Sequence, residues 1–169
     1  MIKKILIALL VIFVIIQFFR PSKNISAGQQ ANNIETKYAV PADVKIILEK
    51  ACYDCHSNNT QYPWYNNIQP VAWWLKRHVD EGKRELNFDE FTNTALRRQY
   101  HKLEEVEEQV KEGEMPLPSY TWIHKNAILK KKKKNALYAW VSSTRAGMEA
   151  KYPIDSLVKP KGAQQPEGK

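Results

Sequence analysis

Two cysteines and one histidine fall within five consecutive residues of this sequence. Cys52 and Cys55 are separated by two residues, and His56 follows directly, which gives the pattern C-x-x-C-H. Each thiol of such a pair can add to one vinyl group of a haem and form a thioether, and the adjacent imidazole can then ligate the iron. The motif therefore predicts one covalently bound haem c per chain, with His56 as an axial iron ligand.

Three other kinds of site use the same residue types. A thioredoxin-like redox pair requires a strand before the motif, whereas an amphipathic helix is predicted there. A zinc site would need two histidines besides the cysteines, and the usual H-x(3–5)-H spacing is absent. A pair of reduced cysteines in an ordinary core would need no cofactor at all. Haem attachment is the favoured interpretation, and the four histidines available for a zinc site are His56, His78, His101 and His124.

The second axial ligand of the iron is predicted to be Met115. This residue lies in a Gly-Glu-Met-Pro sequence, where the following Pro116 restricts the backbone of a loop. Histidine–methionine ligation gives a haem of higher potential that is suited to electron transfer. His78, His101 and His124 remain alternatives to Met115.

Aromatic residues around the motif could form the walls of a haem pocket. Tyr62 could donate a hydrogen bond to a propionate, and Trp64 and Trp73 could pack on the porphyrin. Trp74 and Trp122 are further candidates. Packing in a helical core would explain the same residue types equally well.

Apolar residues recur at intervals of three and four, which predicts an all-α fold of about four helices around the haem. The four helices are expected over residues 41–51, 70–82, 96–113 and 130–145, with Gly82 and Gly113 ending the second and third. No segment alternates well enough to be a strand. A cytochrome c-like bundle is the expected architecture.

The N-terminus combines Lys3 and Lys4 with an apolar run from Ile5 to Phe19. This pattern is typical of an uncleaved signal anchor. We therefore expect a transmembrane anchor helix over residues 1–20 in the cytoplasmic (inner) membrane, crossing it once, with the domain facing the periplasm. A flexible polar tether is expected over 21–37, the haem-binding domain over 38–152, and a disordered tail over 153–169.

The formal net charge of +8 comes largely from the N-terminal segment and from a block of five lysines, Lys130 to Lys134. The remainder is close to neutral, so no broad basic face for nucleic acid is predicted. A lysine block is usually a solvated surface. Alternatively, it could dock onto an acidic redox partner protein or onto anionic lipid.

Four segments of the sequence carry a resemblance to a known family, namely Cys52–Thr60, Tyr62–Tyr65, Gly82–Arg84 and Gly113–Tyr120. They resemble the bacterial haem-binding domain family that is common in Bacteroidota. The similarity covers roughly Tyr38 to Tyr152, and the N-terminal segment is similar too. It implies a mono-haem, cytochrome c-like fold and an envelope location. The lysine block departs from the family pattern.

These patterns together predict one-electron transfer by a covalently bound haem. No acid–base constellation or activated nucleophile stands out, so we do not expect an enzyme. The alternative function is a haem-based redox or gas sensor in which the sixth ligand is displaceable.

Overall fold

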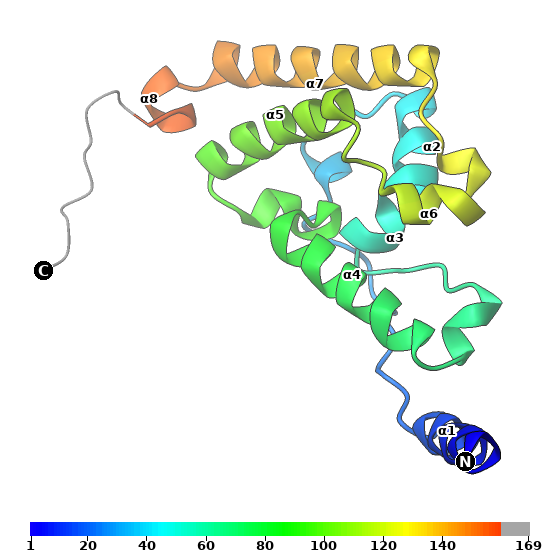
Figure 1. Cartoon of the computed structure of the whole chain (residues 1–169). Helices are drawn as coiled ribbons and strands as arrows, with labels where there is room; N and C mark the ends of the chain where they lie inside the picture. The colour runs from blue at the N-terminus through cyan, green and yellow to red at the C-terminus, as the bar shows by residue number, and fades with distance from the viewer. Residues whose placement is uncertain (160–169) are drawn as a thin grey trace, which may run out of the picture. The chain divides into compact units, whose positions relative to one another are not determined.

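The computed structural model describes residues 1–159, and every regular element in that range is a helix (Figure 1). The predicted all-α class is confirmed. The expected number of about four helices was too low, because residues 1–159 contain eight α-helices and four short 3₁₀ helices. The chain divides into two compact units. The first comprises Met1–Gln29 and Tyr53–Asn87, and the second comprises Gln30–Cys52 and the residues from Phe88 onward.

The first unit is organised around one amphipathic helix. Its elements are α1 (Ile2–Ile16), α3 (Tyr53–His56), η2 (Trp64–Asn67) and α4 (Val71–Glu85). Ala72 and Val79 are buried on one face of α4. Pairs at i and i+4 support its outer face, including Arg77 with Glu81 at 2.8 Å. The helix ends at Glu85, and the backbone becomes extended at Leu86.

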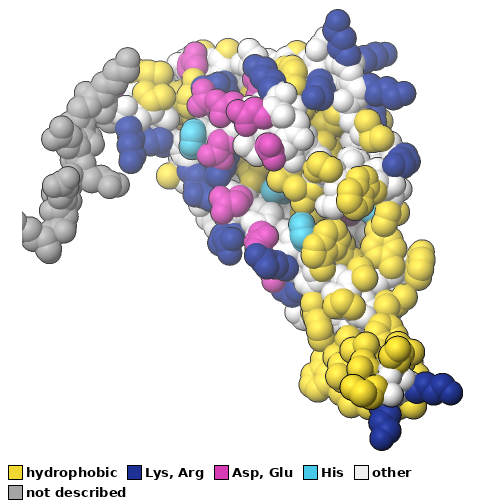
Figure 2. Space-filling model, in the orientation of Figure 1, with side chains coloured by type: hydrophobic (Ala, Val, Ile, Leu, Met, Phe, Trp, Pro, Cys, Tyr) yellow, Lys and Arg dark blue, Asp and Glu magenta, His cyan; other side chains and the backbone are white. Residues whose placement is uncertain are grey.

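The N-terminal helix α1 corrects the prediction of a membrane anchor. It has 15 residues, and at 1.5 Å per residue it is about 22 Å long, against a hydrocarbon thickness of about 30 Å. No helix within residues 1–159 combines the length and apolar character needed to cross a membrane. The predicted single-pass anchor and its placement in the inner membrane are therefore wrong. Figure 2 shows hydrophobic side chains covering the visible face of this helix.

The segment that follows α1 is fixed to the start of α4 by hydrogen bonds. Gln17 Nε2 donates to the Gln69 carbonyl at 3.2 Å, and the Gln69 N–H donates to Gln17 Oε1 at 2.9 Å. The Phe19 carbonyl accepts from Gln69 Nε2 at 3.1 Å and from Trp73 Nε1 at 2.8 Å. These four bonds join residues about fifty positions apart in the sequence.

The second unit packs three long helices around a common core. Its α-helices are α2 (Ala42–Ala51), α5 (Leu96–Glu112), α6 (Pro118–Ile123), α7 (Lys131–Lys151) and α8 (Ile154–Leu157), and its 3₁₀ helices are η1 (Ile34–Thr36), η3 (Phe88–Asn93) and η4 (Lys125–Ala127). Leu48 of α2, Leu103 of α5 and Leu137 of α7 are fully buried. The α2, α5 and α7 segments follow the predicted periodicities, and burial of their apolar faces stabilises the unit.

Two segments predicted to lack structure contain short helices. Within 21–37, η1 places Ile34 in the core, and Asn33 Nδ2 donates to Asp89 Oδ1 at 2.7 Å. Within 153–159, α8 buries Leu157, and the carbonyl of Asp155 accepts from Arg97 at 2.7 Å. One apolar residue in each polar segment is enough to attach it. The rest of the predicted tail, 160–169, lies outside the described residues.

Candidate functional site

The C-x-x-C-H motif lies where one helix ends and a single helical turn begins. Cys52 caps the C-terminus of α2, and its N–H donates to the Leu48 carbonyl at 2.9 Å. Tyr53 to His56 then form α3. The motif passes from the second unit into the first between Cys52 and Tyr53. Helix packing of α2 therefore fixes the start of the motif, and packing of α3 fixes its end.

The imidazole of His56 is oriented by a backbone carbonyl. Its Nδ1 lies 2.9 Å from the Leu86 oxygen, just beyond the C-terminus of α4. A carbonyl can only accept, so Nδ1 carries the proton and Nε2 of the neutral ring carries the lone pair. This is the arrangement found in metal-ligating histidines, where the partner of the other nitrogen fixes the tautomer and raises the basicity of the ligand.

Gly82 allows α4 to lie directly against α3. A Cβ at this position would lie 2.7 Å from the Cys55 carbonyl oxygen and 3.1 Å from the Cys55 Cβ. No side chain fits there without movement of the backbone. The sequence had predicted Gly82 as the end of a helix, but it lies inside α4, three residues before the helix ends. Gly82 allows α4 to approach α3 closely, and this approach brings the Leu86 carbonyl to His56.

The state of the Cys55 thiol distinguishes among the possible chemistries. Burial, with a smaller contribution from the Asp54 carboxylate, raises the pKa of Cys55 to about 11. The thiol is therefore protonated at neutral pH, which disfavours a thioredoxin-like nucleophile, because that chemistry requires a thiolate. No disulfide joins the two cysteines of the described chain. Across residues 1–159, no three His, Cys, Asp or Glu side chains gather as a group that could hold a metal ion.

A polar network supports the loop after the motif. Asn24 Nδ2 donates to the Ser57 carbonyl at 2.9 Å and to Thr60 Oγ1 at 3.0 Å. Thr60 Oγ1 in turn donates to the Asp54 carbonyl at 2.6 Å. Lys83 of α4 donates to Asn24 Oδ1 at 2.6 Å. Sequence analysis missed Asn24, because nothing in a polar segment distinguishes an asparagine that is attached from one in a linker.

Most aromatic residues predicted for the pocket belong to the first unit, where two of them have polar partners, whereas Trp122 lies on α6 in the second unit. The Tyr62 hydroxyl accepts from the Asn24 N–H at 2.7 Å. The Trp73 indole donates to the Phe19 carbonyl. Trp64 is 75% exposed and packs edge-on against Tyr65. Contact of Tyr62, Trp64 and Trp73 with a haem stays a prediction.

Met115 lies in the second unit, on the connection between α5 and α6. The connection begins at Gly113, whose φ of +84° ends α5. The Met115 N–H donates back to the Gln109 carbonyl at 3.1 Å, and the residue is half-buried. The predicted loop is therefore present and held to the end of α5. Ligation of iron by Met115 stays a prediction.

The three alternative histidine ligands have local partners. His101 lies 2.9 Å from Glu105 and 3.6 Å from Glu104, on the exposed side of α5. His78 packs on the Trp74 ring at 4.3 Å, and its Nδ1 lies 2.9 Å from the Trp74 carbonyl. His124 packs on the Tyr120 ring at 4.1 Å.

The donor set at the motif fits a covalently bound haem. It consists of two thiols separated by two residues and one imidazole whose tautomer is set for ligation through Nε2. No curated protein and no solved structure matches the chain. The sequence profile of the haem-binding domain matches residues 11–143, which include the motif, the supporting helix α4 and the Met115 loop. The chain therefore belongs to the haem-binding domain family, and its cofactor is haem.

Proposed function

We propose that the chain carries one haem c, attached through Cys52 and Cys55 and ligated by His56, and that it transfers single electrons. The observation that carries this proposal is the hydrogen bond between His56 Nδ1 and the Leu86 carbonyl. It supports ligation, because it directs the lone pair to Nε2 and holds the ring in one orientation. The protonated Cys55 thiol beside it is consistent with thioether formation.

Each residue of the site has a distinct part in this proposal. When bound, the haem supplies a couple between ferric and ferrous iron. The Leu86 carbonyl holds the Nδ1 proton of His56, which makes the imidazole a stronger donor. Gly82 sets the distance between α3 and α4. Met115 would supply a second ligand to the haem iron. Because this assignment needs no acid, base or nucleophile, we propose an electron carrier and not an enzyme.

The attachment can be tested with the full chain made together with a haem-maturation system. A denaturing gel stained for haem should show colour at the mass of the chain, and the intact mass should exceed that of the polypeptide by one haem. A polypeptide of unmodified mass from a host that matures a control cytochrome would contradict covalent attachment.

Met115→Ala is expected to remove the weak far-red absorption band of a methionine-ligated ferric haem and to lower the reduction potential. The ferrous variant should also bind carbon monoxide faster, because its sixth position is open. Met148→Leu is the control, since Met148 is buried in α7 and this exchange conserves its volume. A band that survives Met115→Ala would shift the assignment to a histidine. Rapid carbon monoxide binding by the unaltered chain would favour the gas-sensor alternative.

The lysine block has two parts with different contacts. Lys134 Nζ donates to the Val110 carbonyl at 2.9 Å, near the C-terminus of α5, where a cation is favourable. Lys133 Nζ donates to the Asn126 carbonyl at 2.8 Å. Lys130, Lys131 and Lys132 are exposed. We therefore propose that only these three dock an acidic redox partner.

Changing Lys130, Lys131 and Lys132 together to glutamine is expected to slow electron transfer to an acidic partner at low ionic strength and to flatten its dependence on salt. Lys134→Gln is the matched control. It should leave the salt dependence unchanged but lower the free energy of unfolding by about 1 kcal/mol. Equal salt profiles for the triple variant and the unaltered chain would contradict docking.

A further inference from the structure

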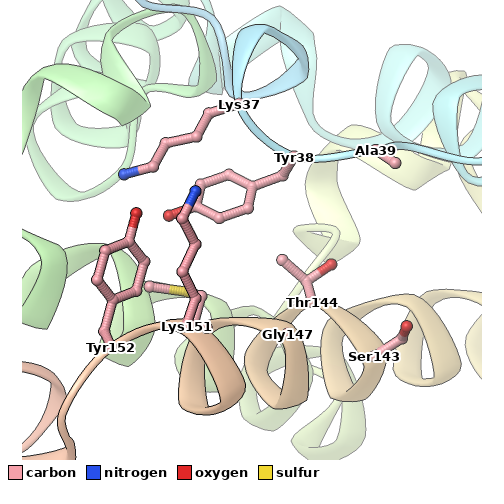
Figure 3. A pocket seen from close by; sticks show the side chains of 9 residues that line it. Lys37, Tyr38, Ala39, Ser143, Thr144, Gly147, Lys151 and Tyr152 are labelled. Atoms are coloured by element: carbon pink, nitrogen blue, oxygen red, sulfur yellow. The ribbon is translucent and has the colours of Figure 1, made fainter.

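The second unit contains a cavity of about 280 Å³ that is separate from the motif. It lies between the segment Lys37–Ala39, which precedes α2, and the C-terminal part of α7 with the following Tyr152 (Figure 3). Neither the haem assignment nor the redox-partner proposal uses these residues. The size is near the lower end for small-molecule sites in proteins.

The cavity is positively charged. Lys37 and Lys151 both line it, and none of its lining residues is acidic. Figure 3 shows the two lysine side chains reaching from opposite walls toward the rings of Tyr38 and Tyr152. The Lys37 Nζ lies 5.4 Å from the Tyr38 centroid and 5.6 Å from the Tyr152 centroid, and the Lys151 Nζ lies 5.6 Å from the Tyr152 centroid. Two ammonium groups thus converge without a carboxylate in the lining to neutralise them.

A buried glutamine positions one wall of the cavity. Gln99 of α5 is 1% exposed. Its Oε1 accepts from the Tyr38 hydroxyl at 2.6 Å and from Lys37 Nζ at 3.4 Å. The Gln99 Nε2 donates to backbone carbonyls of the chain before α5, which fixes the direction of its amide. Lys37 is exposed, and its hydrogen bond to Gln99 places its ammonium group beside the Tyr38 hydroxyl. Ser143 and Thr144 of α7 also line the cavity, and Figure 3 shows them on the far side of Tyr38 from the two ammonium groups.

Gly147 keeps the cavity open on the side of α7. Glycine is an unfavourable residue inside a helix, and Gly147 lies well inside α7. A Cβ at this position would have no atom within 4 Å. At Gly82 a neighbouring backbone atom leaves no room for a side chain, but no such atom lies beside Gly147. A larger side chain here would extend from the wall of the cavity.

We propose that this cavity binds a small molecule bearing a phosphate or carboxylate group. The oxyanion would contact the ammonium groups of Lys37 and Lys151, and the rest of the ligand would lie against the tyrosine rings. Lysines bind phosphate as point charges. The site does not depend on the proposed electron transfer.

The test is a titration of the ¹⁵N-labelled, haem-loaded full chain with inorganic phosphate, acetate and phenyl phosphate at constant ionic strength. Amide shifts should be confined to residues 37–39 and 143–152. Lys37→Gln and Lys151→Gln should each weaken phosphate binding about three- to five-fold, as expected for one partly exposed charge pair. Lys125→Gln, on η4, is the matched control and should leave binding unchanged. Phenyl phosphate should bind more tightly than phosphate if the rings take part.

A second pair of variants tests the cavity itself. Gly147→Leu fills the cavity and should abolish binding, whereas Ala146→Leu, one residue earlier and outside the lining, should preserve it. Larger amide shifts with acetate than with phosphate would identify a carboxylate ligand. Shifts spread over all lysines, equal weakening by Lys125→Gln, or unchanged binding in Gly147→Leu would each overturn the proposal.

Discussion

A chain with both Cys52→Ala and Cys55→Ala is expected to keep no haem colour on a denaturing gel and to have the mass of the bare polypeptide. Each thioether requires one sulfur, so no covalent link remains once both are removed. Each single variant should retain one thioether. The absorption of the denatured, pyridine-ligated haem reports how many vinyl groups remain, so it should separate the single variants from the unaltered chain.

His56→Ala separates attachment from ligation. Because both sulfurs remain, this variant should still carry covalent haem wherever maturation proceeds, but it should lose the spectrum of a six-coordinate iron. Colour retained by the double cysteine variant would contradict attachment through the motif. An unchanged spectrum in His56→Ala would contradict ligation and would leave the hydrogen bond to Leu86 with only a structural role.

Gly82→Ala is expected to destabilise the protein, although alanine is normally the better helix former by about 1 kcal/mol. The added methyl group would lie 2.7 Å from the Cys55 carbonyl oxygen, and this atom belongs to backbone that cannot rotate away. Overpacking of this kind costs about 1–3 kcal/mol, so the net free energy of unfolding should fall by about 1 kcal/mol or more. Movement of α4 should also lengthen the His56–Leu86 hydrogen bond and shift the reduction potential.

Gly147→Ala is the matched control for that prediction. Both glycines lie inside long helices, but the added methyl group at 147 meets open space. It should therefore stabilise the chain by up to about 1 kcal/mol. Urea unfolding of the haem-loaded variants measures both changes. If both substitutions change the free energy of unfolding in the same direction, close packing of α3 on α4 does not determine the effect.

Periodicity was enough to locate α2, α5 and α7, because each of them buries apolar residues at intervals of three or four. The sequence predicted the motif at the site but not the contacts that orient it. The motif is contiguous, but the partner of His56 is a main-chain oxygen thirty residues away. A main-chain oxygen leaves no signature in residue types, so the contact of Leu86 with His56 could not be predicted.

Errors at the N-terminus had a different origin. Hydropathy measures composition and does not show where a helix ends. The predicted apolar helix therefore extended to Phe19, whereas α1 ends at Ile16. Beyond it, the polar character of 21–37 predicted a tether. Hydrogen bonds of Asn24 and burial of Ile34 attach that segment at two points. Both are contacts between distant residues, which a local pattern does not contain.

The reciprocal bonds between Gln17 and Gln69 have a practical consequence for anyone who shortens this chain. A version that starts at Ser22 would lack the Phe19 oxygen and would leave the indole of Trp73 and the amide of Gln69 without their acceptor. A version that starts at Phe13 would keep every one of these acceptors and donors while discarding most of the exposed apolar helix. A chain shortened to improve solubility should therefore begin at Phe13 and not at Ser22, where the sequence changes from apolar to polar.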